Sequence, residues 1–376
     1  MWIEKLILRN FRNYQQAEIS FCKGINMIQG ENAQGKTNIL EAFSLLSTGK
    51  SLRTPNLQDT IREGCSSFFI EALFQKEGVD QRLSLSFDGS SKKINHNHTG
   101  YTSFISLLGI MPSVLITSED ISIIIGSPAE RRRFIDMHIA QIDPLYVYHL
   151  GRYFKAMKQR NALLKQQLDT SLSPWEQIMS SAASYITISR KKHLKLLSPL
   201  AEKYMNILSE SKDELSLQYQ MSLSVQGEEK ELSTQYLAHW IKSRKRDFLL
   251  KSTLNGPHRD DIGLLINEKP AKLFGSEGQK WCFVIALRLA QRDVFYETLG
   301  SAPLIAIDDF GTHLDNKRNK ALLCQIASLG QTFLTSPTPF ACSEVDTKKI
   351  IYVRSGSIIQ AETQYDESTL VLKETS

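Results

Sequence analysis

The chain has 376 residues, of which 41% are hydrophobic and 23% charged, so it can bury a sizeable core in two domains or in one domain with a large insertion. The net charge of +5 suits a polyanionic partner but is too small to identify one. The longest apolar region, residues 104–125, is interrupted by a glycine, a proline and two acids, so we expect no segment that spans a membrane.

The cysteines indicate a reducing compartment. There are five, widely scattered, and no two form a C-x-x-C pair, an arrangement typical of reduced thiols in a cytosolic protein. The N-terminal residues 1–6 mix an acid and a base with apolar residues and lack the long apolar core of a signal peptide. We therefore expect a cytoplasmic protein without a membrane partner. The cysteines are Cys22, Cys65, Cys282, Cys324 and Cys342.

A phosphate-binding loop follows the first strands. Apolar alternation predicts strands that begin at Ile3 and cover residues 17–21 and 25–29, and a helix over 38–46. The intervening residues match G-x-x-x-x-G-K-[ST] at each fixed position. Backbone N–H groups there would surround an anion, Lys36 would reach the β- and γ-phosphates, and the Thr37 hydroxyl would bind Mg²⁺. The alternative is a Gly-rich turn that binds nothing. The candidate cofactor-binding residues are Gly30, Glu31, Asn32, Ala33, Gln34, Gly35, Lys36, Thr37 and Asn38, and the cofactors are ATP and Mg²⁺.

Short strands are expected after this helix. In the basic loop of residues 50–55, Arg53 either reaches a nucleotide phosphate or is solvated. Alternating hydrophobicity over 68–74 and 82–87, with a turn signal at 88–89, predicts antiparallel hairpins.

The region from about residue 127 to 210 is predicted to be helical. Residues 127–130 read as an N-cap serine, a proline and a glutamate that completes a capping box, and residues 173–176 repeat this signal. Asp143 and Pro144 mark another helix start. The basic residues of this region are dense enough for a surface that binds phosphate backbones, although each is equally compatible with a solvated helix face. They are Arg131, Arg132, Arg133, Arg152, Lys155, Lys158, Arg160, Lys165, Arg190, Lys191 and Lys192.

Strand and helix signals alternate in the next segment. Strict alternation over 215–225 predicts a half-buried strand, and a helix is expected over 230–250. The turn at 255–257 leads to His258-Arg259-Asp260-Asp261, either a metal site or the commoner charged turn, before a strand over 262–266.

Two segments in the last third indicate nucleotide chemistry. Residues 303–309 form an apolar strand that ends in two acids, the pattern of a Walker B strand. Asp308 is expected to bind Mg²⁺, and Asp309 to orient or deprotonate the attacking water. The Ser-Glu-Gly-Gln segment at 276–279, before a helix over 281–299, would be a second anion site. In ATP-binding-cassette proteins such a segment grips the γ-phosphate held by the partner subunit.

The motifs together resemble the RecF family of bacterial DNA-repair ATPases, which is related to the chromosome-maintenance and cassette ATPases. They follow the order of that family over nearly the whole chain. The resemblance implies an α/β fold, an ABC-type P-loop NTPase head with an inserted, mainly helical second lobe. Residues 1–120 and 296–376 would form lobe I with Walker A and Walker B, and residues 121–295 would form lobe II with the signature motif. The matching segments besides the phosphate loop are Asn10–Tyr14, Glu119-Asp120, Gly126–Asp136, Gly256–Asp261, Phe274–Gln279 and Asp308–Asp315.

The resemblance also implies an activity and partners. The expected protein is a weak, DNA-stimulated ATPase of recombinational repair and replication-fork maintenance that forms a head-to-tail homodimer when ATP is bound. It would bind gapped DNA or junctions of single-stranded and duplex DNA, and support RecA loading with RecO and RecR. The implied catalytic residues are Lys36, Asp308 and Asp309, the metal ligands are Thr37 and Asp308, and the residues that bind nucleotide across the dimer are Ser276, Gly278 and Gln279.

Some residues depart from the family pattern. Glu277 stands where the family usually has glutamine, His313 replaces a common acid, and Thr335-Ser336-Pro337 differs from the usual strand ending. These departures affect the hydrolysis step more than ATP binding. Asp309, one methylene shorter than the cassette glutamate, fits a slow switch. The alternatives are the ATPase subunit of a membrane transporter and a nucleotide-bound scaffold that does not hydrolyse ATP.

Overall fold

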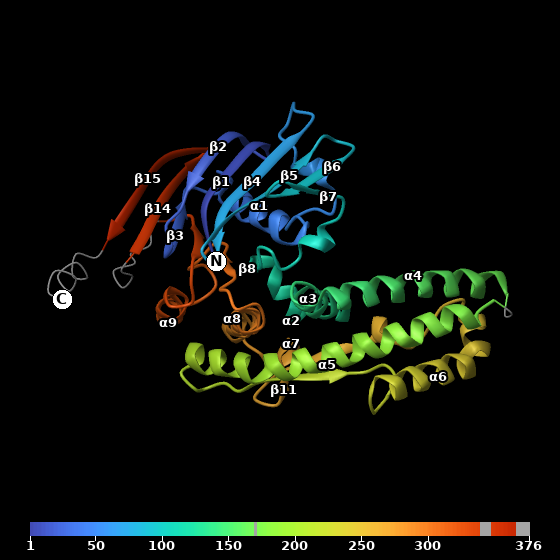
Figure 1. Ribbon diagram of the computed structural model, residues 1–376. Coiled ribbons are helices and arrows are strands. Elements are labelled where there is room, and N and C mark those ends of the chain that lie inside the picture. Colours follow the sequence, from blue (N-terminus) through green and yellow to red (C-terminus); the bar gives the residue numbers. More distant parts are fainter. Residues whose placement is uncertain (169–170, 339–346, 366–376) are drawn as a thin grey trace. The chain divides into compact units, whose positions relative to one another are not determined.

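The computed structural model describes residues 1–168, 171–338 and 347–365, and the chain separates into two compact units (Figure 1). The first unit comprises residues 1–120, 204–212 and 277–376, and the second comprises 121–203 and 213–276. These bounds differ from the expected lobes, because the second unit ends at residue 276 instead of 295 and the stretch 204–212 clusters with the first unit. Cys342 lies outside the described residues.

An antiparallel sheet forms one layer of the first unit. Its strand order is β2-β1-β4-β5-β6-β7, and alternate residues of β1 and β4 are buried, as expected when one face of a sheet packs on a core. The predicted strands and hairpin of the first hundred residues are thereby confirmed. The strands are β1 (Trp2–Phe11), β2 (Tyr14–Ser20), β4 (Phe68–Lys76), β5 (Val79–Phe87), β6 (Lys92–His96) and β7 (Thr99–Tyr101).

A second, mainly parallel sheet carries the motif-bearing loops. Its order is β15-β14-β3-β13-β12-β8, and among these described strands only β15, at the edge, is antiparallel to its neighbour. The carboxyl ends of its parallel strands meet at one edge, the position at which open α/β sheets bind ligands. The strands are β3 (Ile25–Gln29), β8 (Ser113–Ile116), β12 (Leu304–Ile307), β13 (Thr332–Ser336), β14 (Thr347–Arg354) and β15 (Ser357–Tyr365).

Helix α1 (Lys36–Thr48) joins the two sheets into one core. It contacts β4 and β5 of the first sheet and β8 and β13 of the second. Phe43 on α1 packs against Phe333 on β13, with ring centroids 4.6 Å apart, and both side chains are fully buried. This packing holds α1 against both sheets, and thereby the phosphate-loop residues at its first turn. The other helices of the unit are η1 (Leu57–Thr60), η2 (Phe104–Leu107), η3 (Ser118–Ile121), α8 (Glu277–Leu299) and α9 (Asn316–Ala327).

The second unit is mainly helical, as expected. A small antiparallel sheet of order β11-β10-β9 accompanies its helices (Figure 1). Strand β9 ends at Gln220, so the predicted strand reached five residues too far, to 225. Helix α5 continues into the residues that cluster with the first unit. The elements are α2 (Ser122–Ile125), α3 (Pro128–Ala140), α4 (Pro144–Gln166), α5 (Ser173–Ser209), β9 (Leu215–Gln220), α6 (Glu229–Leu250), η4 (Pro257–Arg259), β10 (Asp261–Ile266), β11 (Lys269–Pro270) and α7 (Ala271–Phe274).

The helix starts of this unit occur where proline and N-cap signals predicted them. The Asp143 carboxylate accepts hydrogen bonds from the N–H groups of Leu145 and Tyr146, at 2.9 and 3.1 Å. Ser127 precedes α3, but its side chain makes no capping hydrogen bond, so the capping box predicted there is wrong. Pro128 at the first helical position is sufficient for this start, since its ring presets a helical φ.

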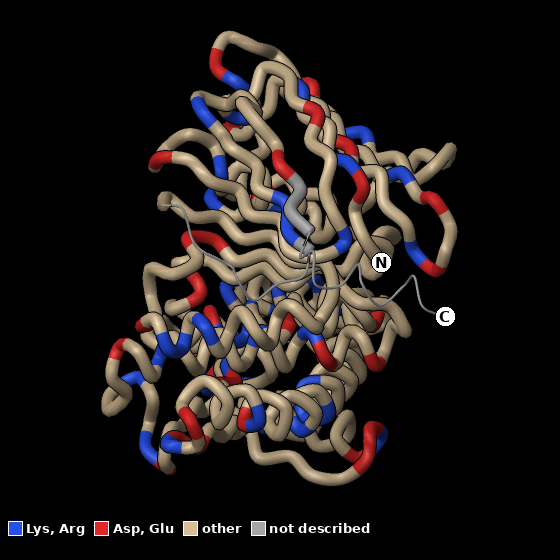
Figure 2. Tube along the Cα trace, turned by 90° about the vertical axis from the view of Figure 1, so that its left-hand side faces the viewer, with Lys and Arg blue, Asp and Glu red and all other residues tan. Residues whose placement is uncertain are grey.

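Several arginines of the predicted phosphate-binding surface are structural. Arg160 is fully buried and contacts carboxylates of Glu176 and Asp247 at 3.0 and 2.8 Å. Arg190, 1% exposed, contacts Asp136 at 2.8 Å, and Arg131 contacts Asp261 at 2.7 Å. These three side chains are not available to DNA, so their assignment to a DNA surface is wrong. Lys, Arg, Asp and Glu positions are interspersed along the chain (Figure 2).

No helix within residues 1–168, 171–338 and 347–365 is long and apolar enough to cross a membrane.

Candidate nucleotide-binding site

The phosphate-loop motif connects the carboxyl end of β3 to the first turn of α1. Gly35 precedes α1 with a φ of +117°, and a Cβ at this position would lie 2.8 Å from the Asn13 amide and 3.0 Å from the Tyr14 hydroxyl. Asn13 donates to the Gln34 carbonyl at 2.8 Å, and Tyr14 donates to the Gly35 carbonyl at 3.1 Å. A glycine is required here for both its conformation and its close packing.

Lys36 begins α1 and lies inside the loop. Its side chain is held by two carbonyls, because Nζ donates to Gly30 O at 2.6 Å and to Glu31 O at 2.8 Å. Lys36 is only 4% exposed, and burial lowers its pKa, while the charges of Asp309 and Asp308 oppose that shift. The Lys36 ammonium group therefore lies in the loop, where the backbone N–H groups and the helix dipole also favour an anion.

The Thr37 hydroxyl and the Walker B acid meet at the same edge of the sheet. Thr37 Oγ1 donates to the Asp308 carboxylate and lies 2.9 and 3.0 Å from its two oxygens. Asp308 immediately follows β12, which covers Leu304–Ile307, so the predicted strand over 303–309 is confirmed but shorter, and both acids lie just after it. Burial raises the pKa of Asp308, and the hydrogen bonds from Thr335 and Thr37 act against that rise.

Thr335, named above only as part of an unusual strand ending, contacts both Walker B acids, a role that the sequence did not predict. Its hydroxyl donates to Asp308 Oδ1 at 2.6 Å and accepts from the Asp309 N–H at 2.7 Å. Asp309 itself has a φ of +49°, a conformation that this contact helps to hold. Thr335 lies next to the acids because β12 and β13 are parallel neighbours with Ile307 opposite Leu334.

The donor set fits the expected magnesium ion. One carboxylate and one hydroxyl, from Asp308 and Thr37, supply the hard oxygen ligands that Mg²⁺ prefers, and such sites complete their coordination with water and phosphate oxygens. Asn38 and Arg53 line the same region. Asn38 donates to Asn13 Oδ1 at 2.8 Å, and the exposed Arg53 approaches Asn38 Oδ1 at 3.4 Å, so Arg53 is near the loop as well as solvated.

The signature segment differs from its predicted conformation. Helix α8 begins at Glu277, so Gly278 and Gln279 lie in its first turn and not in a turn before the helix. Ser276 is assigned to the second unit. Gly278 faces α9, because a Cβ there would lie 2.7 Å from Arg318 Nη1. Lys36, Thr37 and Asp308 therefore lie together at the start of α1, whereas Gly278 lies against α9.

His313, one of the departures from the family pattern, packs on α8. Its ring stacks on Trp281 with centroids 3.9 Å apart and planes at 6°. His313 Nε2 is buried without a hydrogen-bond partner, and burial lowers the pKa of the ring. A neutral aromatic contact thus occupies the position where the family commonly has an acid.

The cluster at residues 258–261 is a structural turn. His258 Nδ1 lies 2.6 Å from the Tyr153 hydroxyl, and its Nε2 lies 3.1 Å from Thr253 O. Asp260 accepts from the N–H of Ser222 at 2.8 Å. Within the described ranges no group of three or more His, Cys, Asp or Glu side chains is placed to hold a metal ion. The charged-turn interpretation accounts for these contacts.

Related proteins are similar in sequence to this chain over nearly its whole length and theirs. The family described as the RecF/RecN/SMC N-terminal domain matches residues 2–359. A protein named "DNA replication and repair protein RecF" from Protochlamydia amoebophila is 39% identical over 353 residues, covering 94% of this chain and 98% of the relative. A protein of the same name from Chlamydia caviae is 39% identical and covers 95% and 98%.

Solved structures agree with the fold. The recombination mediator protein RecF with bound ATPrS, described as part of the RecFOR pathway, superposes with a TM-score of 0.87 at 28% identity and covers 95% of this chain and 97% of that one. An Smc head bound to a domain of ScpA has a TM-score of 0.59 at 16% identity, over 99% of this chain and 100% of that one, and supports the fold alone. The predicted fold class, an ABC-type P-loop head of α/β architecture, is confirmed. The chain belongs to the RecF family.

Proposed function

We propose that this chain is an ATP-binding, weakly ATP-hydrolysing protein that acts on DNA in recombinational repair and replication-fork maintenance. The observation that carries the proposal is the meeting of Lys36, Thr37 and Asp308 at one edge of the parallel sheet. The relatives named as DNA replication and repair proteins, and a RecF structure described with ATP, support the same assignment.

The phosphate loop would bind the nucleotide through its own groups. The loop amides and the dipole of α1 would surround the phosphates, and Lys36 would exchange its two carbonyl contacts for β- and γ-phosphate oxygens. Thr37 and Asp308 would hold Mg²⁺, which neutralises phosphate charge when it is bound. The remaining contacts would come from Gly30, Glu31, Asn32, Ala33, Gln34, Gly35 and Asn38.

Hydrolysis would depend on Asp309. A carboxylate after the Walker B strand can orient or deprotonate the attacking water, provided that it is within hydrogen-bond reach. Thr335 fixes the Asp309 backbone at 2.7 Å, so this chain positions the acid through its main chain. The short aspartate side chain favours slow turnover, which suits a switch.

Dimerisation would complete the site. In the proposed head-to-tail homodimer, Ser276, Gly278 and Gln279 of one copy bind the nucleotide held by the other, with residues 1–120 and 296–376 acting as lobe I and 121–295 as lobe II. The proposed partners are DNA at junctions between single strand and duplex, together with RecO and RecR in support of RecA loading. We place this function in the cytoplasm, without a membrane partner.

Steady-state ATPase assays with and without gapped DNA test the proposal. Wild-type protein should hydrolyse ATP slowly and faster with DNA, Asp309→Asn should bind ATP without hydrolysing it, and Lys36→Ala should lose ATP binding and ATP-dependent dimerisation. Hydrolysis at the buffer rate in wild type would favour the non-hydrolysing scaffold. A dimer that forms with ATP in Lys36→Ala would refute the assigned nucleotide site, and co-purification with a membrane protein would favour the transporter alternative.

A further inference from the structure

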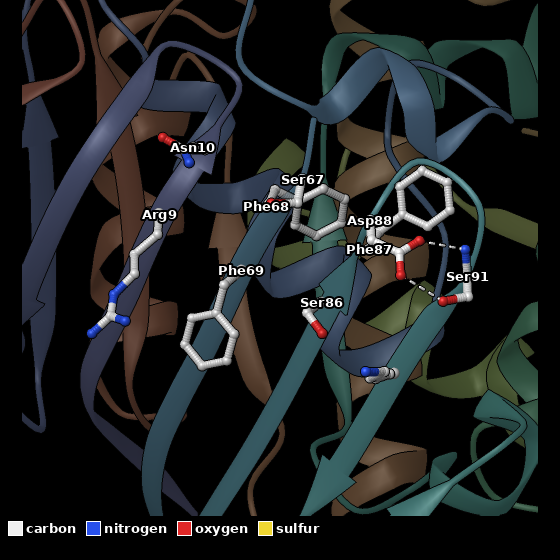
Figure 3. A pocket seen from close by; sticks show the side chains of 10 residues that line it. Arg9, Asn10, Ser67, Phe68, Phe69, Ser86, Phe87, Asp88 and Ser91 are labelled. Carbon is white, nitrogen blue, oxygen red and sulfur yellow. Dashed lines mark hydrogen bonds between the residues drawn. The ribbon is translucent and has the colours of Figure 1, made fainter. Parts of the chain in front are cut away.

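A groove on the antiparallel sheet of the first unit lies apart from the phosphate loop. It has a volume of about 330 Å³, at the lower end of the range for ligand pockets. Figure 3 shows Arg9, Phe69 and Ser86 on adjacent strands of this sheet, with Asp88 and Ser91 at one side. The nucleotide site described above uses none of these residues.

The strand register places a cation on each side of an aromatic ring. Arg9 of β1 is directly opposite Phe69 of β4, Phe69 is opposite Ser86 of β5, and Ser86 is opposite Lys93 of β6. Directly paired residues of antiparallel strands point to the same face. The four side chains therefore form one row across the sheet, and we call it the Arg9–Lys93 row.

The row has the chemistry of a stacking platform. Phe69 is only partly buried, although its neighbours Phe68 and Ile70 on the other face are 2% and 0% exposed. Arg9 and Lys93 are exposed, and the Arg9 guanidinium lies 5.7 Å from the Phe69 ring centroid. Because Arg9 lies over the ring, a base that stacks on Phe69 would displace the guanidinium, which then becomes available to a flanking phosphate.

The acids near the row are already engaged. The Asp88 carboxylate accepts hydrogen bonds from the N–H and hydroxyl groups of both Ser90 and Ser91, at 2.7 to 3.0 Å. Glu71, two residues from Phe69 on the same face, lies 3.6 Å from Arg82. Glu71 is therefore close to a cation of its own, whereas Asp88 is held by neutral donors that lower its pKa and keep it ionised at the side of the row. Arg9 and Lys93 remain exposed to a ligand phosphate.

We propose that the Arg9–Lys93 row binds single-stranded DNA, with one base stacked on Phe69 and the flanking phosphates on Arg9 and Lys93. The inference deepens the proposed function and rests on it for the choice of DNA as the polyanion. A single strand fits better than duplex because paired bases are stacked within the helix and cannot reach an aromatic side chain. An acidic peptide offers charge to the cations but no base for the ring.

The test measures binding of a fluorescent oligo(dT) strand by anisotropy, with an abasic strand of equal length as the second probe. Phe69→Ala should weaken oligo(dT) binding between about fivefold and 150-fold, and should leave the abasic strand unaffected. Phe69→Leu, which keeps an apolar side chain on the sheet, should reproduce that loss. Leu73→Ala, on the same face of β4, is the matched control and should bind as wild type.

The cations are tested by salt dependence. Arg9→Ala and Lys93→Ala should each weaken both strands and reduce the slope of log affinity against log salt by about 0.7. Lys92→Ala is the control, because Lys92 precedes Lys93 on β6 and points to the opposite face. A polyglutamate peptide should compete weakly and without dependence on Phe69.

Three outcomes would overturn the inference: no oligo(dT) binding in wild type, wild-type affinity in Phe69→Leu, or a loss in Phe69→Leu that is as large for the abasic strand. ATP-dependent dimerisation, measured in the same variants, separates this failure from failure of the proposed function. It should persist in each variant of the row and disappear in Lys36→Ala.

Discussion

Replacing Thr335 by valine tests how this chain positions its Walker B acids. Thr335 is fully buried and links the two acids through one donated and one accepted hydrogen bond, at 2.6 and 2.7 Å. Valine preserves the shape of the side chain and removes both contacts. Because Lys36 and the loop carbonyls that hold it do not involve Thr335, nucleotide binding without Mg²⁺ should be retained.

The expected loss of rate follows from the hydrogen bond that Thr335 donates to the charged Asp308 carboxylate. A hydrogen bond of this kind contributes about 1.5–3 kcal/mol, and its loss leaves the Asp309 N–H without its hydroxyl acceptor. If that free energy stabilises the arrangement needed for hydrolysis, Thr335→Val should lower the rate between about tenfold and 150-fold. The Mg²⁺ concentration at half-maximal rate should rise, since Asp308 loses a group that fixes its orientation.

Single-turnover hydrolysis with a Mg²⁺ titration is the appropriate assay. Thr335→Ser, which keeps the hydroxyl, should recover most of the rate and separate the hydrogen bonds from a packing effect. A Thr335→Val protein that hydrolyses ATP at the wild-type rate, with an unchanged Mg²⁺ requirement, would refute the role assigned to Thr335.

Three further outcomes are expected. Gly35→Ala should weaken nucleotide binding roughly tenfold or more in a fluorescent-nucleotide titration, because the new Cβ is strained at a φ of +117°, whereas Gly151→Ala has no neighbour within 4 Å and should bind normally. Arg160→Ala should lower the free energy of unfolding in urea by about 3–5 kcal/mol, because it removes the cation paired with the buried Asp247 and leaves Glu176 with Arg244 alone, and Lys158→Ala should change it by less than about 0.5. Burial lowers the pKa of His258 to about 4, so the unfolded chain binds more protons below about pH 6.5 and stability falls as pH drops. The free energies of unfolding in urea at pH 7.5 and pH 5 should differ by about 2 kcal/mol less in His258→Asn than in wild type, and equal differences would contradict this.

Local signals in the sequence were sufficient for the phosphate loop. Gly35 and Lys36 are dictated by backbone conformation and by one contiguous motif, so their neighbours in the chain identify them. The strand that ends at Ile307 is predictable for the same reason, since an apolar run with two terminal acids needs no distant partner to be recognised.

Residues whose roles depend on distant partners could not be identified in this way. Arg160 and Lys158 are both basic residues of α4, and only the positions of Glu176 and Asp247 decide that Arg160 is buried and Lys158 exposed. Thr335 likewise joins the candidate site through the order of the parallel strands, which no local pattern encodes.

The contacts of α8 connect the signature segment to the Walker B loop within one copy of the chain. Trp281, one turn after Gly278, stacks on His313 at 3.9 Å, and Gly278 lies against Arg318 of α9. In the proposed head-to-tail dimer, the Walker B loop of each copy serves its own nucleotide, while its signature segment serves the nucleotide of the partner. If the partner's nucleotide displaced α8, the ring stack would therefore transmit that movement to the Walker B loop, which serves the copy's own nucleotide. Because burial lowers the pKa of His313, the stacked rings are neutral at neutral pH, so this contact should be less sensitive to salt than an ion pair with the acid that the family commonly has at His313.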